Sequence, residues 1–192
     1  MSSEDLDVPP PDDVAAQPRA LMAELTRHVD EETAARVCAD LLGGADPQGY
    51  PAALPYLAGR AAPGFLAGTW GPGYWSRIWG ARGLLYVWTP DATSAVVAGL
   101  PDPAWRVGEM CLKVAAKREI FSAGDGAARL ADHELPRVRG AAMRALGAVG
   151  DTEHVRTVRA ALDDPDPDVR RHADRALTAM AERLDLAEPP AR

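Results

Sequence analysis

The spacing of apolar residues predicts helices along most of the chain. After Pro18, apolar positions recur every three or four residues, and Asp30 with Thr33 can cap a second helix that ends at Gly43. No stretch alternates between apolar and polar residues as a strand would. The sequence therefore predicts an all-α fold. The apolar positions that carry this pattern in the first two helices are Leu21, Met22, Leu25, Val29, Ala34, Val37, Cys38 and Leu41.

All the tryptophans lie between residues 70 and 105. Residues 59–73 are rich in Gly and Pro and are expected to form a loop plus a short helix, and a longer helix is expected over 72–88. Along that helix Trp75, Trp79 and Arg82 share one broad face. Large aromatics at this spacing either fill a core or, if exposed, anchor a partner.

A helix–proline corner–helix unit recurs in the second half of the chain. Its markers are Pro103-Ala104-Trp105-Arg106, Pro136-Arg137-Val138-Arg139 and Pro167-Asp168-Val169-Arg170, which stand 33 and 31 residues apart. Each marker opens a longer helix (103–118, 136–149, 167–184) that follows a shorter one (92–100, 126–134, 152–162). A fixed period of this kind is typical of a stacked solenoid, because one helix pair cannot bury its apolar side alone.

The same patterns predict the domain organisation. Residues 1–17 are dominated by acids and prolines and are expected to form a disordered tail. Residues 18–186 are expected to form one helical repeat domain, and residues 187–192 a disordered end. Within the domain we expect irregular helices over 18–69, the tryptophan-rich helix over 72–88, and repeats over 91–118, 125–149 and 151–185.

Two segments resemble HEAT repeats of bacterial type. They are Leu162-Asp163-Asp164-Pro165-Asp166-Pro167-Asp168-Val169-Arg170-Arg171-His172-Ala173-Asp174-Arg175-Ala176-Leu177 and Val138-Arg139-Gly140-Ala141-Ala142-Met143-Arg144-Ala145-Leu146-Gly147. The resemblance covers about residues 90–185. It implies a short right-handed α-solenoid of stacked antiparallel helix pairs, in which Arg106, Arg139 and Arg170 would tie adjacent repeats together through aspartates such as Asp102 and Asp166.

Aligning the copies on these arginines places two charges in the inter-helix core. Glu109 takes the position of Ala142 and Ala173, and Lys113 that of Leu146 and Leu177. Burying a charge is costly unless it is paired. Three interpretations stay open: a structural Glu109–Lys113 ion pair with Arg82 as a further partner, an error in the alignment, or a polar pocket walled by Trp75, Trp79 and Trp105.

A second row of arginines is predicted on the inner surface, where it could meet an acidic protein segment or phosphates. It consists of Arg144 and Arg175, with Cys111 in the matching place of the first copy, and Arg137 and Arg171 could line the same surface. The full set of candidate binding residues is Trp75, Trp79, Arg82, Trp105, Arg106, Glu109, Lys113, Arg139, Arg144, Arg170 and Arg175.

The sequence shows no complete catalytic constellation. The histidines and cysteines lack metal-ligand spacing, and no Ser-His-Asp pattern or phosphate-cradling loop is present. We expect no catalytic residue, metal or cofactor. The favoured hypothesis is a non-enzymatic scaffold that binds a protein partner through its concave surface and residues 70–117. The resemblance also allows a HEAT-like DNA alkylation-repair glycosylase, which would use Glu109, or a pigment-binding protein of the bilin lyase type.

Composition narrows the partner class. The net charge of −7 and the pI near 5.1 argue against a dedicated nucleic-acid binder. Arginine far outnumbers lysine, as a high-GC bacterial genome would produce. No apolar run reaches membrane-spanning length, and Cys38 and Cys111 are expected to be buried free thiols in a reducing compartment. These features predict a cytoplasmic protein and leave its oligomeric state open.

Overall fold

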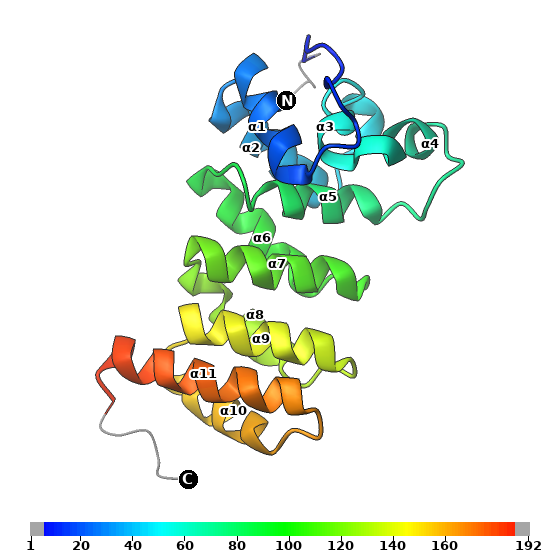
Figure 1. Cartoon of the computed structure of the whole chain (residues 1–192). Helices are drawn as coiled ribbons and strands as arrows, with labels where there is room; N and C mark the ends of the chain where they lie inside the picture. Colours follow the sequence, from blue (N-terminus) through cyan, green and yellow to red (C-terminus); the bar gives the residue numbers. More distant parts are fainter. Residues whose placement is uncertain (1–5, 187–192) are drawn as a thin grey trace. The chain divides into compact units, whose positions relative to one another are not determined.

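The computed structural model describes residues 6–186, and the regular structure in that range is helical throughout (Figure 1). The all-α prediction is therefore confirmed. The chain divides into two compact units, residues 1–96 and residues 97–192. The predicted disorder of residues 1–5 and 187–192 falls outside the described residues.

The first unit is irregular, as the lack of a repeat in its sequence suggests. Its main contact joins α2 to α5, and α3 packs on both α1 and α5. Short 3-10 turns at 47–49, 59–61 and 90–92 bend the chain between helices. The helices are α1 (Pro18–His28), α2 (Glu31–Leu42), α3 (Leu54–Ala58), α4 (Ala62–Leu66) and α5 (Trp75–Gly83).

The start of α2 is capped as predicted. The Thr33 amide donates to Asp30 Oδ1 at 2.7 Å, and the Thr33 hydroxyl donates to Oδ2 at 3.0 Å. The backbone hydrogen bond from Thr33, followed by its hydroxyl bond, lowers the pKa of Asp30. The cap fixes the point at which the chain turns into α2.

Helices α2 and α5 approach each other closely because Gly80 has no side chain. A Cβ at Gly80 would lie 2.8 Å from the Leu42 amide nitrogen and closer still to the Cys38 carbonyl oxygen. Cys38 is fully buried at this contact, and burial raises the pKa of its thiol to about 12. The predicted free, buried thiol is confirmed.

Helix α5 is shorter than the predicted span of 72–88. After Gly83 the chain tightens into turns, in which the Leu85 and Tyr86 amides bond to the carbonyls three residues earlier. Farther on, the Trp88 amide donates to Glu31 Oε1 at 3.1 Å, which ties this connection to the first turn of α2.

Residues 6–17 differ from the expected disordered tail where they carry apolar side chains. Val8 is buried, and the Tyr56 hydroxyl donates to the Pro9 carbonyl at 2.9 Å. The Asp12 amide also donates to Glu24 Oε1 at 2.7 Å. The proline-rich segment therefore packs on the helices of the first unit, because its apolar residues and backbone groups find partners there.

The second unit is a regular stack. Helices α7, α9 and α11 lie side by side, while α8 packs on α9 and α10 packs on α11 (Figure 1). The expected solenoid of helix pairs is present, and the predicted bounds of 136–149 and 167–184 are confirmed. The helices are α7 (Trp105–Arg118), α8 (Gly124–Leu130), α9 (Pro136–Val149), α10 (Val155–Ala160) and α11 (Pro167–Leu184), with α6 (Thr93–Gly99) at the boundary between the units.

Small residues set the distance between α9 and α11. A Cβ added at Gly147 would lie 3.0 Å from the Cα of Ala176 and 3.2 Å from its Cβ. The two backbones therefore approach as closely as their neighbouring side chains allow.

Candidate functional site

The structure corrects the alignment of the three repeats. The longer helices begin at Trp105, Pro136 and Pro167, so both steps are 31 residues. Pro103 stays in the corner before α7, and Trp105 takes the first helical position that a proline holds in the later copies. The predicted step of 33 is therefore wrong by two residues, and the alternative of an alignment error is confirmed.

The corrected register explains the burial pattern. Val107, Val138 and Val169 are equivalent, and all three are buried. Cys111, rather than Glu109, is the equivalent of Ala142 and Ala173, which are also buried. Burial raises the pKa of the Cys111 thiol well above its usual range, so this thiol behaves as a small apolar residue.

The register also joins three cations into one row. Lys113, Arg144 and Arg175 occupy the same position on α7, α9 and α11. Lys113 is partly exposed, and the other two are exposed. The second row of cations thus has three members rather than the two predicted, because Lys113, and not Cys111, occupies its position on α7.

Glu109 lies one turn before Lys113 and is nearly buried, with 5% of its side chain exposed. Its Oε1 accepts from Lys113 Nζ at 2.8 Å and from Arg137 Nε at 2.9 Å. Burial alone would raise the pKa of Glu109, but the hydrogen bonds and charges of Arg137 and Lys113 outweigh it and lower the pKa. The predicted Glu109–Lys113 pair is present, and Arg137 is a partner that the sequence did not reveal.

A groove runs across the three longer helices beside this ion pair. It has a volume of about 460 Å³ and is open to solvent. Most of its lining is charged or polar, which suits recognition of a polar surface more than capture of an apolar small molecule. The lining residues are Glu109, Lys113, Pro136, Arg137, Gly140, Arg144, Asp166, Asp168, Val169 and His172.

Arg144 and His172 meet across the groove. Arg144 Nη1 lies 2.8 Å from His172 Nε2. A guanidinium can only donate, so Nε2 accepts and the imidazole is neutral with its proton on Nδ1. Burial lowers the pKa of His172, and the charges of Arg144, Arg171 and Arg175 lower it further. The histidine therefore adds no charge to the groove at neutral pH.

The groove is lined by three cations, Lys113, Arg137 and Arg144, and by three carboxylates, Glu109, Asp166 and Asp168. Arg137 uses only its Nε on Glu109, so its terminal nitrogens bond to none of residues 6–186, and 66% of its side chain is exposed. Asp168 is paired with Arg171 at 2.8 Å. Asp166 accepts the Asp168 and Val169 amides as the cap of α11. Both kinds of group therefore stay available in the groove: the terminal nitrogens of Arg137 as donors, and the second carboxylate oxygen of Asp168, whose side chain is 68% exposed, as an acceptor.

Trp105 extends the cationic face toward the start of α7. The guanidinium of Arg106 lies 4.3 Å from the Trp105 ring centroid and that of Arg137 lies 5.7 Å from it. Trp105 and Glu109 are thus linked through Arg137, and Arg106 joins them through the Trp105 ring; all but Arg137 are predicted site residues. The ring holds two cations near the groove and is itself half-buried.

Arg139 and Arg170 lie at the corners rather than in the groove. Arg139 binds both carboxylate oxygens of Asp164, at 2.7 and 2.8 Å, and donates to the His133 and Glu134 carbonyls. Arg170 donates to the Asp164 and Pro165 carbonyls. The predicted tie between repeats exists at Arg139, but through Asp164 rather than Asp166, because Asp166 caps α11. Arg106 is not part of this ladder.

Trp75, Trp79 and Arg82 belong to the first unit. Trp79 is buried against Phe65, with their ring centroids 4.9 Å apart, and Trp75 is half-buried. Arg82 donates to the Leu57 carbonyl, so it serves the core of its own unit. Trp79 fills a core, which is the alternative that the sequence left open. Trp70, stacked on Trp79 at 5.6 Å, keeps 40% of its surface exposed.

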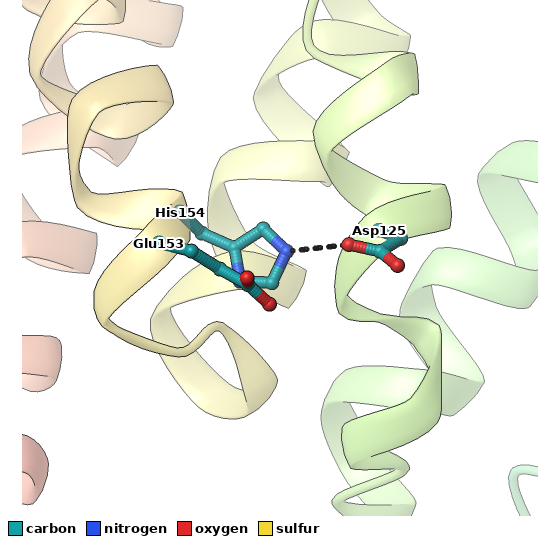
Figure 2. A group of neighbouring side chains, drawn as sticks. All are labelled: Asp125, Glu153 and His154. Atoms are coloured by element: carbon teal, nitrogen blue, oxygen red, sulfur yellow. Dashed lines mark hydrogen bonds and ion pairs between the residues drawn. The ribbon is translucent and has the colours of Figure 1, made fainter.

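A cluster of possible metal ligands lies between α8 and the start of α10 (Figure 2). One ligand atom from each of Asp125, Glu153 and His154 falls within 4.8 Å of the others, which no spacing in the sequence predicts. His154 Nδ1 accepts the Asp151 amide at 2.8 Å, and Nε2 lies 3.2 Å from Asp125 Oδ1.

The hydrogen bonds of His154 oppose metal binding. Since Nδ1 uses its lone pair on the Asp151 amide, the proton of the neutral imidazole sits on Nε2, where it is donated to Asp125. A metal ligand needs the reverse arrangement, with a free lone pair toward the metal and N–H on the other nitrogen. We therefore assign His154 to the cap before α10 and to the link between consecutive repeats.

Comparison with known families identifies the repeat. Residues 126–188, from within α8 to beyond the end of α11, match a family model described as HEAT repeats. The repeat that contains α7 lies outside the matched range. A comparison with curated proteins found no match. Among the described residues, no helix is long and apolar enough to cross a membrane; the cytoplasmic location stays a prediction.

Proposed function

Because this chain is a HEAT-repeat protein, we propose that it is a non-enzymatic scaffold that binds a protein partner through the groove on α7, α9 and α11. HEAT repeats in general serve as protein-interaction scaffolds. In a stack of helix pairs, the second helices line the inner, concave surface that such proteins use for binding.

The observation that carries the proposal is the row of cations with unused donors. Lys113, Arg144 and Arg175 stand on successive helices, and Arg137 presents two terminal nitrogens beside them. Structural arginines in this unit, such as Arg139, instead spend their donors on carboxylates and carbonyls. Cations that are held in place but keep free donors are suited to an external anionic group.

The enzymatic alternative gains no support from Glu109. A glycosylase would need a carboxylate that can reach a base or a water molecule. The carboxylate of Glu109 is nearly buried and is neutralised by Lys113 and Arg137. Of the tryptophans that the pigment-binding alternative would use, Trp79 has a core role, because it is buried against Phe65.

Site-specific crosslinking in the native host tests the proposal. A photoreactive amino acid replaces Asp168, an exposed residue of the groove, or Arg156, an exposed residue of α10 in the other layer. We expect a discrete protein adduct from position 168 only, and its loss when Arg144→Glu and Arg175→Glu are added. Identical adducts from both positions, or none from position 168, would overturn the proposal.

A further inference from the structure

We propose that the groove binds a partner segment in the polyproline II conformation that carries a carboxylate side chain at every third residue. This inference rests on the proposed function and names the chemistry of the partner. It follows from the spacing of the cations, from the charge that each of them leaves uncompensated, and from the donors that Arg137 presents beside the groove.

The first argument is the spacing of the row. Packed helices lie about 8–10 Å apart, and Lys113, Arg144 and Arg175 sit at one register position on three consecutive helices. A polyproline II segment has three residues per turn and rises about 3.1 Å per residue, so side chains on one of its faces repeat every 9 Å or so. One acidic side chain per turn therefore meets one cation per helix.

A β-strand fits the same row poorly. Its side chains on one face repeat every two residues, about 7 Å, which falls short of the helix spacing. Residues three apart match the distance but point to opposite faces of a strand. The close contact of Gly147 with Ala176 shows that α9 and α11 are tightly packed, and one polyproline II turn of about 9 Å falls within the packing range of about 8–10 Å.

The second argument is the charge available at each step. Lys113 already shares its charge with Glu109, and Arg144 donates one terminal nitrogen to His172, which is neutral. Arg144 keeps its Nε and Nη2 for a ligand, and Arg175 bonds to no residue in the described range. Arg144 and Arg175 thus each offer about one unit of positive charge, while the two carboxylates of α11 at the groove have partners of their own, since Asp166 caps the helix and Asp168 pairs with Arg171. Single carboxylates match this distribution, whereas a phosphate dianion is best held by several cations that converge on one point.

The third argument is solvation of the partner backbone. A polyproline II segment makes no internal hydrogen bonds, so its carbonyls stay free to accept from protein donors. Arg137, with its terminal nitrogens exposed beside the groove, supplies such donors. Its charge is partly offset by Glu109, which suits it to a neutral carbonyl more than to a carboxylate.

Binding of synthetic peptides to the full chain tests the inference. The probes are labelled, proline-rich peptides with three glutamates, placed at every third residue, at every second residue, or consecutively, all of equal length and composition. Fluorescence anisotropy is measured at low and at physiological salt. We expect the every-third peptide to bind about tenfold more tightly than the other two, with an affinity that falls as salt rises.

Charge-reversal variants locate the site. Arg144→Glu and Arg175→Glu are each expected to weaken the every-third peptide about fivefold or more, because attraction becomes repulsion. Arg156→Glu and Arg159→Glu make the same change of net charge on exposed residues of α10 and should leave the affinity within twofold. Circular dichroism melts confirm that each variant is folded before binding is compared.

Further probes separate other ligands. A peptide with one phosphoserine in place of the three glutamates, and a DNA duplex of random sequence, are titrated alongside. Tighter binding of either one, or no preference among the three spacings, would refute the inference. If residue 168 still crosslinks to a protein in a manner that depends on Arg144, the scaffold proposal survives and only the acidic polyproline II segment is discarded.

Discussion

Arg139 grips Asp164 with two parallel hydrogen bonds, from Nε to Oδ2 at 2.7 Å and from Nη2 to Oδ1 at 2.8 Å. The pair joins α9 to the corner before α11, and both side chains are largely buried. The remaining donors of Arg139 hold the His133 and Glu134 carbonyls of its own corner. One side chain thus fixes two successive repeats relative to each other.

Removing this clamp should destabilise the second unit. Arg139→Gln leaves the Asp164 carboxylate without its partner in a poorly hydrated site, and we expect the free energy of unfolding to fall by about 3 kcal/mol. Arg170→Gln is the matched control. It removes bonds to two carbonyls from an exposed side chain and should cost about 1 kcal/mol. Urea denaturation measures both, and equal losses would contradict the clamp.

The Arg139–Asp164 pair should also make the free energy of unfolding fall at acid pH. The hydrogen bond and charge of Arg139 lower the pKa of Asp164 below its value in the unfolded chain. The folded state therefore gains stability that is complete above about pH 4 and is lost as the pH falls through the lower, folded pKa. Arg139→Gln should show a flatter decline of unfolding free energy between about pH 4 and pH 2. A decline as steep as that of the unmodified protein would contradict this assignment.

His172 reports on the charge of the groove. Burial and the charges of Arg144, Arg171 and Arg175 lower its pKa. Arg175→Gln should raise that pKa toward the unperturbed value, as measured by NMR titration of the imidazole protons. Arg156→Gln, on α10, removes the same charge elsewhere and should not move it. An unchanged pKa in Arg175→Gln would show that this side chain does not act on the groove.

His154 should carry its proton on Nε2. Two-bond proton–nitrogen NMR correlations of the imidazole distinguish the tautomers, and the Asp151 amide bond to Nδ1 requires the Nε2–H form. Addition of Zn²⁺ should leave the melting temperature of the protein unchanged. A rise that disappears in Asp125→Ala or Glu153→Ala would instead establish a metal site.

Gly80→Ala should destabilise the first unit although alanine is the better helix former. The added Cβ would collide with the Leu42 amide and the Cys38 carbonyl, and these backbone atoms cannot move without separating α2 from α5. We expect a net loss of about 2 kcal/mol in a thermal or urea melt. Gly73→Ala places its Cβ in open space and should stay within about 0.5 kcal/mol of the unmodified protein.

The sequence predicts the longer repeat helices almost to the residue because proline and apolar spacing are local signals. It fails at the first repeat, where Trp105 replaces the proline that starts α9 and α11, and Pro103 two residues earlier misleads the alignment. The recurrence of valine would have corrected it, since a step of 31 aligns Val107 with Val138 and Val169. That register would have revealed the Lys113–Arg144–Arg175 row from the sequence alone.

Other parts of the site depend on long-range contacts. Arg137 joins Glu109 across 28 positions of the chain, and His172 meets Arg144 across another 28. No spacing rule within one helix links such pairs. The burial of each tryptophan was equally unpredictable from the sequence. Tryptophans that lie close together in the sequence include a buried ring, Trp79, and a partly exposed one, Trp70.

The close contact between Gly147 and Ala176 carries no charge, yet it sets the distance between α9 and α11, the helices that hold Arg144 and Arg175. The distance between these helices and the charges that they carry are therefore encoded by different residues. Replacing an arginine with a glutamate on one helix would change the charge that the proposed ligand must carry at that position. The spacing between the helices, and so the three-residue spacing of the ligand side chains, would stay the same. A bulkier residue at Gly147 would do the opposite, since it would keep every charge and increase the distance between α9 and α11.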